Sequence, residues 1–258
     1  MGLAWNCRGL SNALSPTIPK IRALVSNNYF DFLFIMETKC NVSSVSPIFR
    51  SFGFDKTVGV DALGASGGLW VGWRREAKMR HVYSCIHFVV LLVEIYNGLL
   101  WYLVLFYGAP SSSKRASVLS DLECRLSSFQ NELVDIPFKG PQFTWCNNQK
   151  GQDRVYERLD KAMGSKDWFT FFPNTGLKHY PIQISDHAPI ELDFNLISNG
   201  SRKPYKLDSW ALEHEECVKE VQKAWLTKFK GSPAFQVTRK LAVFKQRMKS
   251  WTLDKRQD

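Results

Sequence analysis

Residues 88–107 read FVVLLVEIYNGLLWYLVLFY, and this stretch decides the fold class. An apolar run of this length resembles a membrane span, but Glu94 and the Asn97-Gly98 pair interrupt it. Asn-Gly between two apolar segments is the strongest short-range signal for a β-hairpin. We therefore predict two buried strands, Phe88–Tyr96 and Leu99–Tyr107, instead of a transmembrane helix, and we expect no membrane partner.

The segments around this hairpin alternate between strand and helix patterns. Continuous apolar runs predict further strands at residues 2–6, 30–36, 67–73 and 189–194, and helical spacing predicts helices at 15–28 and 113–133. The second helix is expected to continue to Pro137. Strands that are apolar throughout are typical of sheets buried on both faces. The order of these elements predicts a layered α/β sandwich.

Positive charge is unevenly distributed along the 258 residues. Lys+Arg 34 and Asp+Glu 24 give +10, of which residues 1–197 contribute 20 minus 17 and residues 198–258 contribute 14 minus 7. Two basic helices are predicted near the C-terminus, over 212–229 and after Ser232-Pro233. We therefore predict a sandwich domain over 1–197 and a basic helical tail over 198–258. Such an excess favours nucleic acid as a partner, although a charge run is more often a solvated face.

Cysteine usage and the N-terminus bear on the cellular compartment. The six cysteines lie at least 22 residues apart, which excludes a CxxC zinc or redox pair. The chain opens MGLAWNCRG, without the long apolar region of a secretory signal. We expect reduced thiols and an intracellular protein.

Polar side chains stand at the ends of four predicted strands. Asn6, Glu37 and Tyr107 each follow a strand, and Ser185-Asp186-His187 precedes the last one. Oxygen ligands suit Mg²⁺, which takes one or two carboxylates together with water and phosphate. A neutral histidine can accept a proton from water or hydrogen-bond a phosphate. The set therefore predicts a metal-dependent phosphodiesterase site.

Seven short motifs carry a family resemblance. They are WNCRGL at 5–10, ETK at 37–39, GGLW at 67–70, FYGAP at 106–110, FTWCN at 143–147, ERLDK at 157–161 and SDHAP at 185–189. In this order they resemble the endonuclease/exonuclease/phosphatase superfamily. More narrowly, they resemble the apurinic-type endonuclease domain of plant LINE (non-LTR) retrotransposon polyproteins. The resemblance spans about residues 1–197, and the basic tail resembles the linker that precedes the reverse transcriptase in those polyproteins.

The resemblance implies a metal site that holds Mg²⁺ or Mn²⁺. Glu37 would be a direct ligand, with Asn6 and Asp186 completing the protein's part of the site. Asn6 would also contact the substrate, which the resemblance implies is DNA.

The resemblance also implies catalytic roles. His187 would act as the general base or as the group that polarises the phosphate, and Asp160 would orient its imidazole. Tyr107 would contact the scissile phosphate, and Asp186 would assist catalysis from beside the metal. Asn147 would help hold the substrate. The reaction implied is hydrolysis of a DNA phosphodiester bond.

One motif of the family is missing from the sequence. The family carries a Gly-Asp-x-Asn segment between the strand that ends at Tyr107 and the Phe-Thr-Trp strand, which supplies a water-activating Asp. Asp121 and Asp135 lack the preceding glycine and the following asparagine. We expect a core strand to be absent and, because loss of a catalytic group costs orders of magnitude in rate, an impaired enzyme.

Two other functions remain open. The chain is alternatively a phosphodiesterase or phosphatase of the same superfamily that acts on another substrate. It is alternatively a basic nucleic-acid-binding remnant without catalysis, whose affinity should fall steeply with salt and mostly vanish without residues 198–258. A DNA substrate implies a nuclear location, and the sequence does not indicate an oligomeric state.

Overall fold

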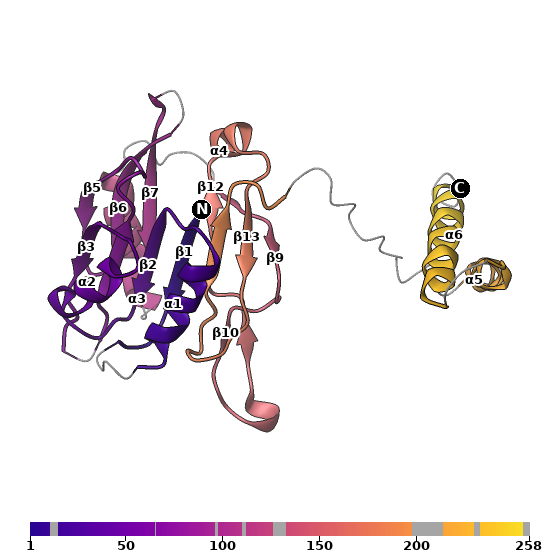
Figure 1. Ribbon diagram of the computed structural model, residues 1–258, viewed down its shortest axis with the longest axis horizontal. Helices are drawn as coiled ribbons and strands as arrows, with labels where there is room; N and C mark the ends of the chain where they lie inside the picture. Colours follow the sequence, from indigo (N-terminus) through magenta and orange to yellow (C-terminus); the bar gives the residue numbers. More distant parts are fainter. Residues whose placement is uncertain are drawn as a thin grey trace. The chain divides into compact units, whose positions relative to one another are not determined.

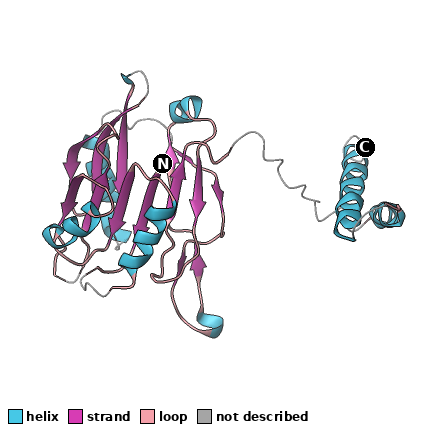
Figure 2. Ribbon diagram, viewed as in Figure 1, coloured by secondary structure: helices cyan, strands magenta, loops and turns pink. Residues whose placement is uncertain are grey.

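The computed structural model describes residues 1–10, 15–64, 66–95, 98–109, 112–125, 133–197, 214–229 and 233–254. The chain divides into two compact units, Met1–Asn199 and Gly200–Asp258. In the first unit, strands form the inner layers and helices lie outside them (Figure 1 and Figure 2). No helix in these ranges is long and apolar enough to cross a membrane.

Unit 1 is built around a seven-stranded sheet with the order β3-β4-β2-β1-β14-β13-β9. Its strands are β1 (Gly2–Asn6), β2 (Phe32–Met36), β3 (Lys56–Val60), β4 (Leu69–Trp73), β9 (Phe138–Lys139), β13 (Gly176–His179) and β14 (Ile190–Asp193). β1 and β2 run parallel, with Asn6 opposite Met36. Their carboxyl ends therefore lie side by side, which brings Asn6 next to the residue that follows β2.

A second sheet contains the predicted hairpin. Its strands β5 (Met79–Ser84), β6 (Phe88–Glu94) and β7 (Leu100–Phe106) are antiparallel, and β6 pairs with β7 from Phe88↔Phe106 to Glu94↔Leu100. The two apolar runs therefore form strands as predicted, but the structure corrects their predicted burial. β6 is mostly buried, whereas β7 exposes Leu100, Tyr102 and Phe106 because its side chains alternate between the sandwich interior and solvent. Tyr96 and Asn97 lie outside the described residues.

Alternate residues of β2 face different layers, as a period of two requires. Leu33 and Ile35 pack against α1 (Thr17–Asn27) and α2 (Val42–Arg50). Phe32, Phe34 and Met36 pack against the second sheet, through Val89, Leu91 and Leu105. The outer face of that sheet is covered by α3 (Ser112–Arg125), through Val118 and Leu122. The fold is a layered α/β sandwich, which confirms the predicted class.

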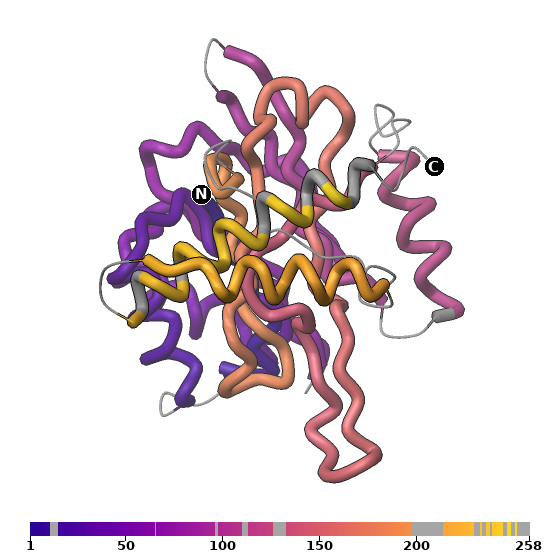
Figure 3. Tube along the Cα trace, turned by 90° about the vertical axis from the view of Figure 1, so that its right-hand side faces the viewer, coloured from indigo at the N-terminus to yellow at the C-terminus, as the bar shows by residue number. Residues whose placement is uncertain are grey.

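Several short elements complete unit 1. β10 (Trp145–Cys146) pairs with β11 (Tyr156–Glu157), and β8 (Val134–Asp135) pairs with β12 (Met163–Gly164), which precedes α4 (Lys166–Phe171). The β10–β11 hairpin, with η2 (Gly151–Asp153) at its tip, projects from one end of the unit (Figure 3).

The structure corrects the predicted extension of the 113–133 helix to Pro137, while residues 126–132 of that helix lie outside the described residues. α3 ends at Arg125 within the described residues, and Val134–Asp135 form a strand. Val134 is β-branched, and Pro137 disfavours a helical backbone at the residue before it. Among the strands described, β7 pairs only with β6, and β8 pairs only with β12. The second layer of the sandwich is therefore divided into the β5-β6-β7 sheet and the β8-β12 pair.

The described residues of unit 2 form the helices α5 (Glu215–Leu226) and α6 (Pro233–Asp254). Cys217 and Met248 are buried between them, and Phe244 and Trp251 pack against this pair. The described part of unit 2 thus has a small apolar core.

Candidate functional site

Glu37 joins the ends of strands from both sheets. It follows β2, and its Oε1 accepts hydrogen bonds from Asn6 Nδ2 at 2.9 Å and from the Tyr107 hydroxyl at 3.1 Å. Asn6 is the last residue of β1 and Tyr107 follows β7. The other carboxylate oxygen, Oε2, has no hydrogen bond from any described residue. One oxygen of Glu37 therefore fixes its position and the other is available to a ligand.

The backbone at this point is left-handed. Glu37 has φ +53° and Arg8, two residues after Asn6, has φ +52°. This region costs an ordinary L-residue roughly 1–2 kcal/mol, and such conformations cluster at functional sites. The turns after β1 and β2 are therefore strained at the two places where polar side chains enter the same cluster.

His187 and Asp160 form a close pair. Nδ1 of His187 lies 2.9 Å from Oδ2 and 3.2 Å from Oδ1 of Asp160, and only 15% and 11% of the two side chains are exposed. An ionised carboxylate only accepts hydrogen bonds, so Nδ1 carries the proton. Nε2 of the neutral ring is then left as an acceptor. Asp160 is itself held, because its N–H donates to the buried Thr144 hydroxyl at 2.9 Å.

Asp186 connects this pair to the end of β1. Its Oδ2 accepts hydrogen bonds from Arg8 Nη1 and from Trp145 Nε1, both at 2.9 Å. The Ser185 hydroxyl lies 3.2 Å from Asp186 Oδ1 and 2.8 Å from the carbonyl oxygen of Asn6. Both oxygens of Asp186 therefore have neighbours within the protein.

The charges of this cluster act on one another. Burial alone would lower the pKa of His187, but the hydrogen bond and charge of Asp160, with the charges of Asp186 and Glu37, raise it above its ordinary 6.5. Burial, followed by the charge and hydrogen bond of Glu37, raises the pKa of Tyr107 to about 12. Tyr107 is thus a neutral phenol at physiological pH, and Glu37 lies close enough to influence His187.

The structure brings together six of the seven predicted site residues, and Asn147 is the exception. Its Nδ2 donates to the carbonyl oxygen of Asp153 at 2.8 Å, and its Oδ1 accepts from the N–H groups of Gln149 and Val155. These bonds hold the β10–β11 hairpin in shape. Contact between Asn147 and a substrate stays a prediction.

The cluster also contains four residues that were not predicted to be site residues. They are Arg8, Thr144, Trp145 and Ser185. All four lie inside the quoted motifs, so their positions beside the predicted residues were the available signal.

The donor atoms suit a hard cation. Within the ranges that the structure describes, no group of three or more His, Cys, Asp or Glu side chains is arranged to hold a metal ion. Mg²⁺ needs fewer protein ligands, because it keeps several waters and takes one or two carboxylates together with substrate phosphate. Oε2 of Glu37, with the amide of Asn6 beside it, fits such a site, whereas both oxygens of Asp186 already have hydrogen-bonding neighbours.

In the described part of the segment where the family motif was expected, no second acidic group reaches this cluster. Asp121 bonds to Arg125 on α3 at 2.8 Å, and Asp135 forms an ion pair with Arg158. No acidic side chain in residues 112–125 or 133–142 hydrogen-bonds to the cluster. Residues 126–132 lie outside the described part of the chain.

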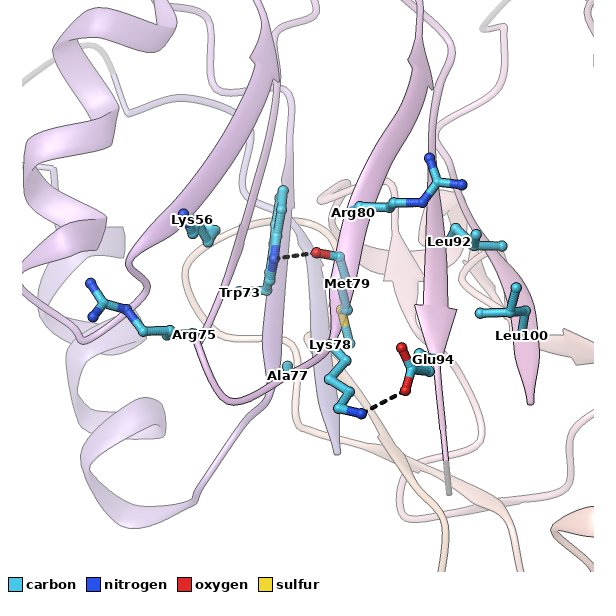
Figure 4. Close-up of a pocket in the computed structure, with 10 residues that line it drawn as sticks. All are labelled: Lys56, Trp73, Arg75, Ala77, Lys78, Met79, Arg80, Leu92, Glu94 and Leu100. Carbon is cyan, nitrogen blue, oxygen red and sulfur yellow. Dashed lines mark hydrogen bonds and ion pairs between the residues drawn. The ribbon is translucent and has the colours of Figure 1, made fainter. Parts of the chain in front are cut away.

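A cavity of about 240 Å³ lies at the opposite end of the sandwich, where β7 begins (Figure 4). Its lining includes four basic residues, Lys56, Arg75, Lys78 and Arg80. Lys78 points to Glu94 and forms an ion pair with it, while Arg75 and Arg80 point in different directions. Its basic groups do not converge on a common point, so we place the candidate site at the end where Glu37 and His187 lie.

Comparison with known proteins identifies the fold. No family model and no curated protein matches the sequence. The structure is similar to an AP endonuclease (LMAP) from Leishmania major, with TM-score 0.55 and 12% identity over 74% of this chain and 86% of that one. It is similar to the 3′-5′ exonuclease NExo from Neisseria meningitidis, with TM-score 0.53 and 12% identity over 75% and 99%.

A third similar structure is D. rerio TDP2 complexed with single-strand DNA product. Its TM-score is 0.50, with 11% identity over 73% of this chain and 96% of that one. All three proteins belong to the endonuclease/exonuclease/phosphatase superfamily. Unit 1 therefore has the sandwich fold of that superfamily.

Proposed function

We propose that unit 1 is a metal-dependent phosphodiesterase that acts on DNA, the endonuclease domain of a LINE-type element, with reduced activity. The observation that carries the proposal is the meeting of the His187–Asp160 pair and the Asn6–Glu37–Tyr107 group in one cluster. The similar structures, an AP endonuclease, a 3′-5′ exonuclease and a complex with a single-strand DNA product, support DNA as the substrate class. A nuclear location is part of the same proposal.

His187 is the group that moves a proton in this scheme. With Nδ1 donating to Asp160, the free Nε2 of a neutral ring accepts a proton from water. In the protonated ring, Nε2 instead donates to a phosphate oxygen on which charge develops. The cluster raises the pKa of His187 above its ordinary value, which favours the protonated ring more than in a free imidazole.

The reacting phosphate is also contacted by a second group of residues, which would hold the metal or donate a hydrogen bond. They are Glu37, Asn6 and Tyr107. When Mg²⁺ or Mn²⁺ is bound, it supplies positive charge against the negative charge that develops on the phosphate. Glu37 Oε2 and the Asn6 amide are the groups that would hold it. Tyr107 remains protonated, so its hydroxyl is a hydrogen-bond donor that can pass from Glu37 to a phosphate oxygen.

The reduced activity follows from the missing acidic group. No described side chain other than His187 is left in the cluster to deprotonate water, because both oxygens of Asp186 have neighbours, Asp160 holds the imidazole and the free oxygen of Glu37 is assigned to the metal. A nuclease that lacks a general base or a positioning carboxylate loses roughly 10²–10⁴-fold in rate.

The test is nicking of supercoiled plasmid by the full chain in Mg²⁺, alongside an intact superfamily nuclease. We expect nicking at least about 100-fold slower than that of the reference enzyme. His187→Ala and EDTA should each abolish the residual nicking. Nicking at the reference rate would contradict the impairment. Nicking unaffected by His187→Ala would contradict the assignment of the site.

A second function is favoured by the same missing group. If no nicking is detected, unit 1 is a binding module, and the charge of residues 198–258 provides much of its affinity for nucleic acid. Equilibrium binding measured from 50 to 200 mM salt distinguishes this case, because a binding module loses affinity steeply with salt while showing no Mg²⁺-dependent product.

A further inference from the structure

Arg8 brings a permanent positive charge into the cluster. Its Nη1 donates to Asp186 Oδ2, and its backbone N–H donates to Asn6 Oδ1 at 3.3 Å. The two partners differ in exposure, since 52% of the Arg8 side chain is exposed but only 8% of Asp186. A nearly buried carboxylate therefore holds one end of a guanidinium whose other side is open to solvent.

A positive side chain partly offsets the negative charge that the protein's own carboxylates give this site. Glu37, Asp160 and Asp186 are three carboxylates within one cluster, and a DNA phosphate that approaches them is repelled. His187 is cationic only when protonated, whereas a guanidinium is always charged. In the part of the chain that the structure describes, Arg8 contributes the cationic side chain that hydrogen-bonds to this cluster.

Arg8 also has unused hydrogen-bond donors. A guanidinium carries five N–H groups, and described residues accept one of those of Arg8. The remaining donors form a planar fork, which matches two oxygens of a phosphate. The contact with Asp186 fixes the orientation of this fork before a substrate arrives.

We propose that Arg8 binds a phosphate group of the nucleic-acid substrate directly, oriented for this by Asp186. The inference rests on the proposed function, because it names how that site recognises its substrate. It assigns Asp186 a positioning role through its contact with Arg8. A purely structural Arg8 would instead serve only as the counter-ion of Asp186.

The test measures equilibrium binding of the full chain to a short labelled DNA duplex in EDTA, so that no cleavage is involved. The variants are Arg8→Ala, Arg8→Lys and, as a matched control, Arg80→Ala, which removes the same charge from an exposed position at the opposite end of the sandwich. Unit 2 is unchanged in all of them, so differences in salt dependence arise from unit 1. Thermal unfolding by circular dichroism identifies any variant that fails to fold, and Arg8→Lys then carries the comparison.

We expect Arg8→Ala to bind about tenfold more weakly and to lower the slope of log K against log salt by about 0.9, the value for one phosphate contact. Arg8→Lys should keep the slope but bind more weakly than the wild type, because an ammonium lacks the planar fork. Arg80→Ala should bind as the wild type does.

Two results would overturn the proposal. One is an unchanged affinity in Arg8→Ala, and the other is a loss of affinity with the wild-type slope, which is what a structural counter-ion would give. Both are independent of hydrolysis. A chain that shows the expected slopes but never nicks plasmid supports the Arg8 contact and contradicts the nuclease assignment. A chain that nicks plasmid but shows no change in slope for Arg8→Ala supports the nuclease assignment and contradicts the Arg8 contact.

Discussion

Burial lowers the pKa of His187, and the hydrogen bond and charge of Asp160 are the main effects that raise it. The net effect raises the pKa in the folded protein, so the protonated ring contributes stability that is complete below pH 6.5 and is lost as pH rises through the raised value. In Asp160→Asn the burial remains but the hydrogen-bonded negative charge is gone. We therefore expect the pKa of His187 to fall, and any Mg²⁺-dependent rate to fall roughly 10²–10⁴-fold.

The titration is measured by NMR of the imidazole protons in EDTA, with His187→Ala identifying the signal. Glu157→Gln, which changes an exposed carboxylate on the neighbouring strand β11, is the matched control and should leave the titration unchanged. An Asp160→Asn protein whose His187 titrates as in the wild type would show that Asp160 does not hold the imidazole.

Glu37 combines a strained backbone with a functional side chain, so stability and activity should respond to its removal in different ways. Glycine adopts φ +53° without steric cost, which offsets the hydrogen bonds lost from Asn6 and Tyr107. We expect Glu37→Gly to change the free energy of unfolding by no more than about 1 kcal/mol while abolishing metal-dependent activity. Denaturant titration and plasmid nicking measure the two effects.

Lys39→Gly is the control for the strain, because Lys39 has φ +54° and makes no hydrogen bond to the cluster. It should be stabilising by up to about 1 kcal/mol with the activity unchanged. Strong destabilisation by Glu37→Gly would mean that the side-chain contacts outweigh the backbone strain.

At the scale of elements, the contact between β7 and α4 links the two parts of the divided layer. Trp101 of β7 packs edge-on against Trp168 and Phe171 of α4, with ring centroids 5.4 and 5.8 Å apart. The indole N–H groups of Trp101 and Trp168 are buried without a hydrogen-bond partner among the described residues. The contact is therefore apolar and carries the cost of two unsatisfied donors.

Substitution of Trp101 separates these two effects. Trp101→Phe keeps a ring in the contact and removes one unsatisfied donor, which by itself costs about 1–3 kcal/mol, so we expect a protein at least as stable as the wild type. Trp101→Ala removes the packing and should destabilise by about 2 kcal/mol or more. Denaturant unfolding measures both, and a larger loss in Trp101→Phe than in Trp101→Ala would contradict the account.

The elements that the sequence predicts well are those whose own residues determine them. The hairpin of β6 and β7 follows from two apolar runs and an Asn-Gly turn, and β1 and β2 from short runs buried on both faces. α2 and β13 were not predicted, because the Pro47 inside α2 and the glycine at the start of β13 obscure their patterns. The strand at Val134–Asp135 forms because Met163–Gly164 pairs with it, and that partner is not visible in the local sequence.

The site shows the same distinction. Polar residues at strand ends indicated Asn6, Glu37, Tyr107 and His187, because strand direction alone brings such ends together. The hydrogen bonds from Arg8 and Trp145 to Asp186 depend on the directions of the side chains, which no rule of sequence spacing predicts. Arg8 and Asp186 are 178 residues apart in the sequence. The hydrogen bonds that Asn147 makes within its own hairpin could not be predicted from its position in the sequence, and its contact with a substrate stays a prediction.

At the scale of the whole molecule, the candidate site and most of the net positive charge lie in different parts of the sequence. The candidate site lies in unit 1, while residues 198–258 carry 14 basic and 7 acidic residues. Attraction of a polyanion by such charge falls with salt and requires little defined structure. The two units can therefore contribute to nucleic-acid binding through different physical effects.

The units should also differ in stability. Among its described side chains, unit 2 has a core that includes Cys217 and Met248, with Phe244 and Trp251 beside it. A pair of helices held by a core of this size is marginally stable. Met248 is fully buried, so Met248→Ala should cost about 2–5 kcal/mol and unfold α5 and α6 together. Unit 1, with its own larger core, should keep its unfolding transition.

Hydrogen exchange measured by mass spectrometry tests this separation. Peptides from residues 215–254 should lose protection in Met248→Ala, while peptides from β1, β2 and β6 should keep it. Leu241→Ala is the matched control, because Leu241 lies on the same helix with 50% of its surface exposed, and it should change little. Because unfolding leaves the charge of residues 198–258 in place, the salt-dependent part of DNA binding should survive in Met248→Ala. Loss of protection in both units at once would show that they fold as one body.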